Sequence, residues 1–204
     1  MILQLGYLAL IAYFCPKYDI MKVPIATFLC FCFLLLGCQN QHHIDKRYLI
    51  TKNSVGHLTK GTRVNQLDSI FSQDSVLVKR VNRRFSEGNT IVVYGENHHE
   101  QLLLKPAQRF DSTSVIASVE IVDTLYQTRD GLRLGGDFEV AESHYRISRI
   151  ENILGAAVVF LDDLNVYFTI DKAAIKKPTK MGVQIKASQI KDTAEIQHLW
   201  VSWN

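Results

Sequence analysis

The sequence predicts an α+β protein made of two similar halves, each with a glycine turn and a short helix packed on an antiparallel β-meander. Two observations carry this prediction. Two short segments about 74 residues apart share a glycine that is followed by apolar residues at helical spacing. Each segment is then followed by several runs rich in β-branched and aromatic residues, which are typical of strands.

The repeated segment begins at Gly56 in the first half and at Gly131 in the second. Aligning Gly61 with Gly135 places Val64, Leu67 and Phe71 on Phe138, Ala141 and Tyr145. Residues at i, i+3 and i+7 share one face of a helix, so each trio predicts a short amphipathic helix. Thr62 and Asp137 occupy the expected N-cap positions, and the preceding glycines permit a tight turn into the helix.

Strand-like runs follow each predicted helix. They are 76–81, 90–94, 101–105 and 115–122 in the first half, and 156–161, 165–170 and 195–203 in the second. Turn-forming residues at 96–99 and 162–165 separate neighbouring runs, as a meander requires. The closing strands also correspond, because Ile116, Val119 and Ile121 align with Ile196, Leu199 and Val201. Residues 173–191 predict a loop, with 182–185 as a candidate strand.

An apolar run at 23–37, preceded by Met21-Lys22 and followed by polar residues, indicates a leader. A signal peptide needs about 7 to 15 apolar residues, whereas a transmembrane helix needs about 20. We therefore interpret residues 21–37 as a signal peptide. Residues 2–14 form a second apolar run, which could make a membrane hairpin with the first. We favour translation from Met21, with residues 1–20 as a start-site artefact.

The end of this leader, Leu35-Leu36-Gly37-Cys38, resembles the lipobox of bacterial lipoprotein signal peptides. The resemblance implies a diacylglycerol on the Cys38 sulfur, cleavage before Cys38 and acylation of the new N-terminus. Three acyl chains anchor a protein far more firmly than one. It also implies a location in the cell envelope. The residues that follow Cys38 are not acidic, which favours an outer-membrane protein that faces the periplasm. An ordinary cleaved signal or an uncleaved anchor are the alternatives.

The composition of the mature part excludes several classes of protein. All four cysteines, Cys15, Cys30, Cys32 and Cys38, lie in the leader or at its cleavage point, which leaves no disulfide and no cysteine metal site. The formal net charge of the full sequence is only +3, which argues against a dedicated binder of nucleic acid. Residues 38–47 are polar and predict a tether between the lipid and the domain.

The two halves, bounded at 48–123 and 124–204, resemble the β-lactamase-inhibitor-protein-like fold of small outer-membrane lipoproteins of the SmpA/OmlA type. In that family a Gly-x-Thr turn and a helix pack on an antiparallel sheet, and tandem copies occur. The second half departs from the motif, because Gly136 stands where the first half has Thr62. The resemblance implies a protein-binding module without catalytic residues.

No pattern in the sequence predicts a catalytic, cofactor or metal site. His98-His99-Glu100 contains zinc-ligating residue types, but adjacent hairpin residues do not easily converge on one ion. The glycines and Thr62 at 56–62 lack the lysine of a phosphate-binding loop, and no nucleotide is expected outside the cytoplasm. A Gly-x-Ser-x-Gly nucleophile motif is also missing from the sequence.

The sequence therefore predicts a lipid-anchored, non-catalytic module that binds an envelope protein. Its candidate binding residues are His198, Trp200 and Trp203 in the last strand, because one face of an antiparallel sheet can stay in solvent. Trp200 and Trp203 lie on opposite faces of a strand, so one of them belongs to the core.

Two alternatives remain open from the sequence. The first is an inhibitor or immunity-type protein that acts against an envelope enzyme or toxin. The second is an extracytoplasmic hydrolase that uses His98, His99 or His144 together with nearby carboxylates. The hydrolase requires a deep pocket that brings at least two of those groups together.

Overall fold

The computed structural model of the protein describes residues 44–72, 74–80, 89–95, 98–177, 180 and 182–203. The predicted start-site artefact, the signal peptide, Cys38 and most of the tether lie outside these residues. No helix within the described residues has the length and apolar character that a membrane crossing needs.

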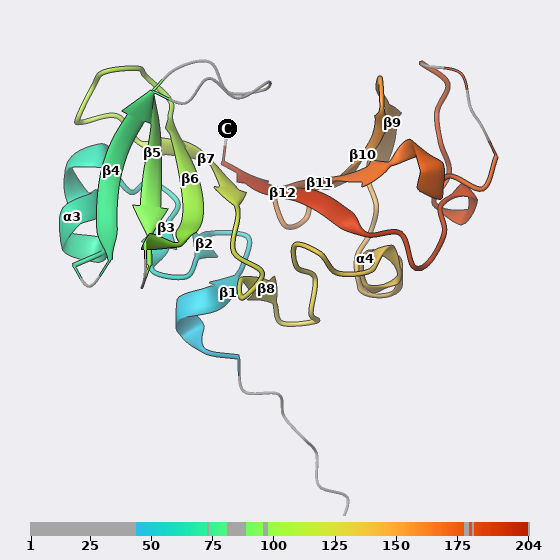
Figure 1. The fold of residues 1–204 in the computed structure, drawn as a ribbon, viewed down its shortest axis with the longest axis horizontal. Coiled ribbons are helices and arrows are strands. Elements are labelled where there is room, and N and C mark those ends of the chain that lie inside the picture. The colour runs from blue at the N-terminus through green and yellow to red at the C-terminus, as the bar shows by residue number, and fades with distance from the viewer. Residues whose placement is uncertain are drawn as a thin grey trace, which may run out of the picture. The chain divides into compact units, whose positions relative to one another are not determined.

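An eight-stranded antiparallel sheet dominates the fold (Figure 1). Its strands are β4 (Ser75–Arg80), β5 (Asn89–Tyr94), β6 (Glu100–Pro106), β7 (Ile116–Ile121), β9 (Arg149–Asn152), β10 (Ala156–Leu161), β11 (Val166–Asp171) and β12 (Ile196–Ser202). Their order across the sheet is β4-β5-β6-β7-β12-β11-β10-β9. The mixed α+β class predicted from the sequence is therefore confirmed.

The sheet is continuous because β7 and β12 pair at its centre. Val119 lies opposite Val201, and Ile121 lies opposite Leu199. All four side chains are fully buried or nearly so, at no more than 1% exposure. Branched apolar residues pack well on a pleated surface, so this central pair joins the strands on either side of it through one core.

A second, four-stranded sheet was not predicted. It contains β1 (Leu49–Ile50), β2 (Ser54–Val55), β3 (Leu58–Thr59) and β8 (Gln127–Thr128), in the order β3-β2-β1-β8. Gly56, between β2 and β3, has φ 55°. A Cβ atom there would lie 2.2 Å from the carbonyl oxygen of Arg47, so the turn requires glycine.

The two predicted helices form, but their starts differ from the prediction. The first is a 3-10 turn, η2 (Val64–Gln66), that continues into α3 (Leu67–Ile70), and the second is α4 (Phe138–His144). Thr62 is not the N-cap, because its Oγ1 accepts a hydrogen bond from the Thr59 N–H instead. Arg63 takes that position, and its N–H donates to Gln66 Oε1 at 2.9 Å. Asp137 is the N-cap of α4 but makes no capping hydrogen bond through its side chain.

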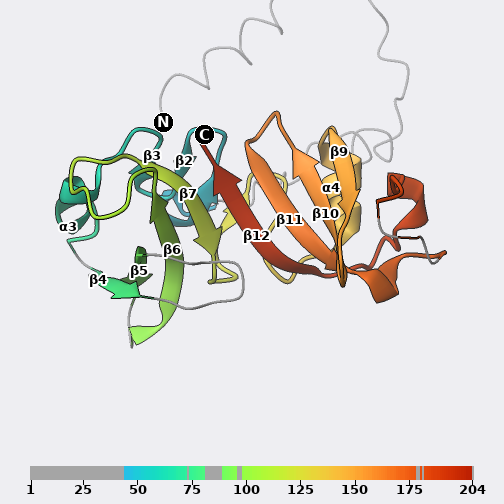
Figure 2. The same cartoon turned by 90° about the horizontal axis from the view of Figure 1, so that it is seen from above.

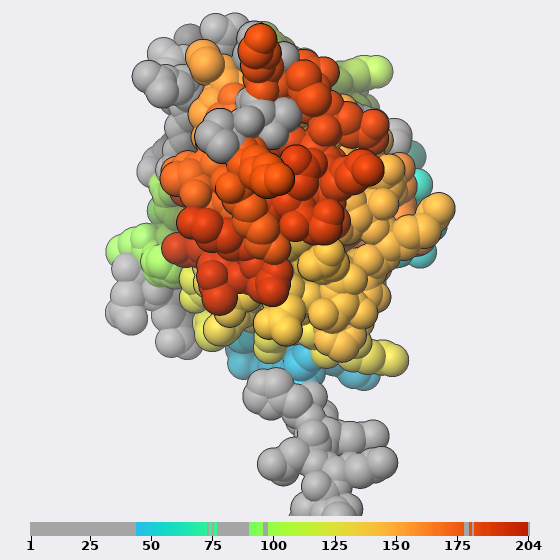
Figure 3. Space-filling view, turned by 90° about the vertical axis from the view of Figure 1, so that its right-hand side faces the viewer, coloured from blue at the N-terminus to red at the C-terminus, as the bar shows by residue number. Residues whose placement is uncertain are grey.

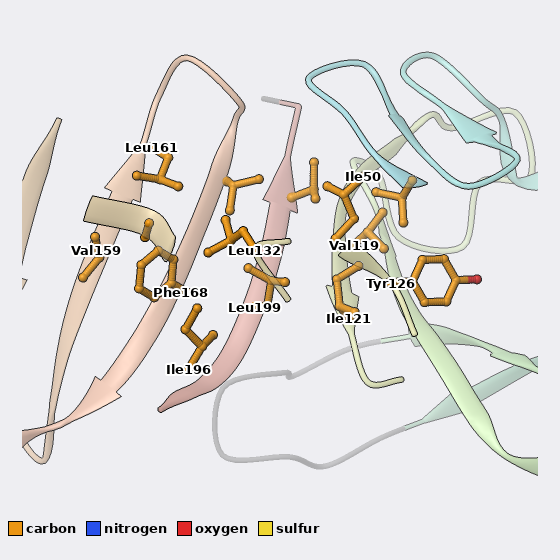
Figure 4. Close-up of a cluster of buried hydrophobic side chains, with 14 of the residues drawn as sticks. Ile50, Val119, Ile121, Tyr126, Leu132, Val159, Leu161, Phe168, Ile196 and Leu199 are labelled. Carbon is orange, nitrogen blue, oxygen red and sulfur yellow. The ribbon is translucent and has the colours of Figure 1, made fainter. Parts of the chain in front are cut away.

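The main core fills one face of the large sheet. The apolar side of α4, the segment around Leu132 and the small sheet pack on this core face (Figure 4). Phe138 of α4 and Phe168 of β11 are both fully buried, with ring centroids 6.5 Å apart. Alternation along the strands sends the intervening side chains, among them Phe160, Tyr167 and Trp200, to the opposite side, called the open face below.

Outside the sheets, the chain is less regular. A short 3-10 turn, η1 (Lys46–Tyr48), precedes β1, and the segment between β11 and β12 contains η4 (Lys172–Ala174) and η5 (Ala187–Gln189). The candidate strand at 182–185 does not form. Figure 3 shows this red segment and the gold α4 at the surface of the β9 end.

Candidate functional site

A row of stacked rings crosses three neighbouring strands of the open face. Phe160 of β10 lies opposite Tyr167 of β11, and Tyr167 lies opposite Trp200 of β12. The ring centroids of these two pairs are 5.7 Å and 5.0 Å apart, at interplanar angles of 24° and 13°. The His198 ring extends the row, with its centroid 5.3 Å from Trp200 at 18°. We call these four side chains the ring row; their strands lie side by side in Figure 2.

The Arg149 guanidinium lies at one end of the ring row. The guanidinium carbon of Arg149, on edge strand β9, lies 3.6 Å from the centroid of the Phe160 ring. This distance is typical of a cation–π contact. Arg149 also forms ion pairs with Glu151 at 3.0 Å and Asp162 at 3.5 Å, which hold the guanidinium in place over the ring.

Strand alternation explains why these residues share the open face. Phe168 and Leu199, the neighbours of Tyr167 and Trp200, are fully buried in the core face. A register shift between Thr169 and Ile170 interrupts the pairing of β11 with β12. Such a bulge re-aims side chains locally, and His198, which pairs with Thr169 just beside it, is 53% exposed.

A small hollow of about 90 Å³ lies beside the ring row. It is lined by Thr90, Leu103, Lys105, Ser118, Glu120, Tyr167 and Trp200. The Glu120 side chain is only 17% exposed, and its Oε1 lies 3.6 Å from His198 Nδ1. Burial, and then the charge of Glu120, raise the pKa of Tyr167 above its ordinary value. Tyr167 is therefore a neutral hydrogen-bond donor at physiological pH.

Of the three binding residues predicted in the last strand, the structure brings two into this site. His198 and Trp200 belong to the ring row. Trp203 does not, because it is 8% exposed and its indole N–H donates to the carbonyl oxygen of Lys52 at 3.1 Å. Trp203 is therefore a core residue, and its place in the predicted binding set is corrected.

The other predicted residues lie elsewhere. The turn glycines all have positive φ: 55° at Gly56, 90° at Gly61, 87° at Gly131 and 73° at Gly135. The histidines of the hydrolase hypothesis, His98, His99 and His144, are exposed, and they sit before β6 and at the end of α4. His99 Nε2 approaches Asp123 Oδ2 at 3.8 Å. Within the described ranges, no group of three metal-ligating side chains comes together.

Sequence reasoning missed Phe160, Tyr167, Arg149 and Glu120. Their signal was present in part, since Phe160 and Tyr167 lie in strands that were predicted and alternate with buried neighbours. The sequence did not reveal the strand order and register, which together place residues 149, 160, 167 and 200 in one row.

Comparison with known proteins gives a distant structural likeness. No protein-family model and no curated protein matches the chain. The chain is similar to the crystal structure of the uncharacterized protein yfeY from Escherichia coli, with 12% sequence identity and a TM-score of 0.48. The match covers 76% of this chain and 99% of that chain. A likeness at this level carries no argument about function.

Proposed function

We propose that this protein is a lipid-anchored protein of the cell envelope that binds another protein through the open face of its large sheet and is not an enzyme. The observation that supports this proposal is the ring row with Arg149 at its end. A few residues supply most of the binding energy at protein interfaces, and Trp, Tyr and Arg are enriched among them. Because these rings already stack on one another, they lose little conformational entropy when a partner docks.

The size of the hollow beside the ring row supports a protein partner over a substrate. Sites for small molecules have volumes of roughly 300–1,000 Å³, whereas this hollow measures about 90 Å³. That volume suits one side chain of a docking protein. Glu120, together with the hydroxyl groups of Thr90 and Ser118, favours a side chain that donates hydrogen bonds.

The lipid anchor is proposed on the lipobox resemblance at Cys38. The residues from 39 to 47 would span at most about 30 Å when fully extended, which keeps the domain close to the membrane. Replacing Cys38 with Ser should release the protein from the membrane fraction. Unchanged fractionation of that variant, with an unmodified mass, would remove the anchor from this proposal.

We also infer that the protein consists of two similar halves, 48–123 and 124–204. Equivalent backbone hydrogen bonds support this inference: Val64 N to Ser114 O (3.0 Å) and Phe138 N to Ala194 O (2.9 Å), then Ile116 N to Thr62 O and Ile196 N to Gly136 O (both 2.9 Å). Both closing strands also have a register shift near their start, after Ile116 in β7 and after Ile196 in β12. Tandem copies are what the resemblance to the β-lactamase-inhibitor-protein-like fold implies.

Site-specific photo-crosslinking in the protein's own host tests the docking face. A photoreactive amino acid at Gln197, which is exposed beside the ring row, should give one discrete crosslinked product. The same group at Glu142, exposed on α4 at the opposite side of the sheet, is the matched control. Adding Tyr167→Ala and Trp200→Ala should abolish the product at Gln197. Equal products at both positions would contradict the proposal, and an enzyme or toxin as the captured protein would favour the inhibitor alternative.

A further inference from the structure

A larger hollow of about 270 Å³ lies at the base of the predicted tether. It opens between η1, the turn that joins β2 to β3, the end of α3 and strand β6. The described residues that line it are Arg47, Tyr48, His57, Ile70, Phe71, Ser72, Asp74, Gln101 and Tyr126. This volume is just below the range of small-molecule sites and suits a ligand of only a few heavy atoms or the terminal group of a larger one.

The charges around this hollow are not balanced. Arg47 at the rim is already paired with Asp45, with its Nη2 atom 2.9 Å and its Nε atom 3.0 Å from Asp45 Oδ2. Asp74 is half-buried, and no described residue donates a hydrogen bond to its carboxylate or forms an ion pair with it. Arg47 is the cation that lines the hollow, but Asp45 holds its guanidinium 5.6 Å from the centroid of the Tyr48 ring. A half-buried carboxylate that the neighbouring cation does not pair with attracts a positively charged ligand.

Aromatic walls accompany that carboxylate. Tyr48 and Tyr126 pack edge to face, with ring centroids 5.2 Å apart at 86°, and Phe71 is buried beside them. The Tyr126 hydroxyl donates to Gln101 Oε1 at 3.3 Å, which fixes the ring. Burial raises the pKa of Tyr126, the charge of Asp74 raises it further, and the charge of Arg47 lowers it, so Asp74 and Arg47 both act on this ring. Aromatic rings next to a carboxylate are a recurrent arrangement for binding ammonium groups.

We propose that this hollow binds the primary ammonium group of a small organic amine, held by the Asp74 carboxylate beside the Tyr48 and Tyr126 rings. The proposal does not depend on the open face, which lies elsewhere on the molecule. Two sources could supply the same group: a free amine, or the amine headgroup of a phospholipid in the membrane to which the tether leads. The second source rests on the lipid anchor proposed above.

Calorimetric titration of the full protein, purified in a non-ionic detergent, tests this site. Ethanolamine is the probe, and ethylene glycol, which has the same shape without the charge, is its control. Asp74→Asn removes the carboxylate charge at constant volume and should weaken ethanolamine binding at least about tenfold, or about 1.4 kcal/mol. Asp68→Asn, an exposed acid on the neighbouring helix α3 that does not line the hollow, should leave the affinity unchanged.

The outcomes separate cleanly. Binding of ethanolamine that Asp74→Asn weakens and Asp68→Asn does not would support the site, with a free amine as its ligand. Binding only to vesicles that contain phosphatidylethanolamine, and not to phosphatidylglycerol vesicles, with the same loss in Asp74→Asn, would support the headgroup. No heat with either probe, or equal binding by Asp74→Asn with an unchanged melting temperature, would overturn the proposal.

Discussion

The open face of the large sheet differs between its two ends. Over β5 and β6 it is closed, because Val92, Tyr94 and Leu103 form a second buried cluster there, at 0%, 6% and 3% exposure. Over β10, β11 and β12 the same face carries rings that are only half-buried, and His198 is exposed. The same face of one sheet is thus buried at one end, where it stabilises the fold, and carries solvent-accessible aromatic rings at the other. The exposed end is where a partner can gain binding energy.

The largest loss of stability should come from a substitution in the core face beneath the ring row. Phe168→Ala removes a fully buried ring that packs on Phe138 and should lower the free energy of unfolding by about 3–5 kcal/mol. Phe160→Ala, on the neighbouring strand but on the open face, is the matched control and should cost about 1 kcal/mol. Urea denaturation measures both. Equal losses of unfolding free energy in the two variants would mean that the ring row is part of the core. The two ends of the open face would then not differ.

A substitution in the buried cluster over β5 and β6 should lower the free energy of unfolding almost as much. Leu103 is 3% exposed and lies opposite Val92 and Glu120 in the sheet, so Leu103→Ala should cost about 2–4 kcal/mol. Val158→Ala, on the open face of β10 where the side chain is half-buried, should cost clearly less. A loss below about 1 kcal/mol for Leu103→Ala would show that the two ends of this face do not differ in the way described.

A tyrosine that lies outside the open face, Tyr145, should make the protein less stable as the pH becomes alkaline. Burial raises the pKa of Tyr145 to about 12; its hydroxyl donates to Asp130 Oδ2 at 2.8 Å and lies within hydrogen-bond distance of Thr128 Oγ1, at 2.6 Å. The folded state resists deprotonation, so this contribution is present in full below the unfolded pKa of about 10 and is lost as the pH rises from 10 to 12. Tyr145→Phe should cost about 1 kcal/mol at pH 7 and should flatten that alkaline loss. An equally steep loss in the variant would assign it to other groups.

Long strands could be predicted from the sequence, and short ones could not. The runs at 90–94 and 156–161 are dense in β-branched and apolar residues, and the structure places β5 and β10 there. The strands of the small sheet have two residues each, too few to show any periodicity. Its parallel pairing of Leu49 with Gln127 also joins residues that are far apart in sequence, which no local pattern reveals. Thr62 was mistaken for a cap because a local hydroxyl–backbone bond to Thr59 competes for the same atom.

The residues of the candidate site could be predicted only where alternation within one strand determines which face a side chain occupies. Trp200 and His198 follow from their place in β12, whereas Trp203 shares the parity of Leu199 and Val201 and is buried with them. The rest of the ring row depends on strand order and register, which pair Tyr167 with Trp200. Those contacts are set by the tertiary fold and by the bulge after Thr169. The hollow around Asp74 depends in the same way on residues from distant parts of the chain.

The smallest expected effect is the change in the pKa of Tyr167 when Glu120, beside the ring row, is replaced. Burial and then the charge of Glu120 raise the pKa of Tyr167, so Glu120→Gln should lower that pKa while leaving it above its ordinary value. The measurement is a spectrophotometric tyrosine titration, in which subtracting the Tyr167→Phe variant isolates this one side chain. Glu151→Gln, an exposed acid on β9 that pairs with Arg149, is the control and should leave the Tyr167 titration unchanged. An unchanged titration in Glu120→Gln would mean that the carboxylate does not act on the ring row. The hollow would then offer a docking side chain apolar and hydroxyl contacts and the Lys105 side chain, and the preference for a hydrogen-bond-donating partner would fall.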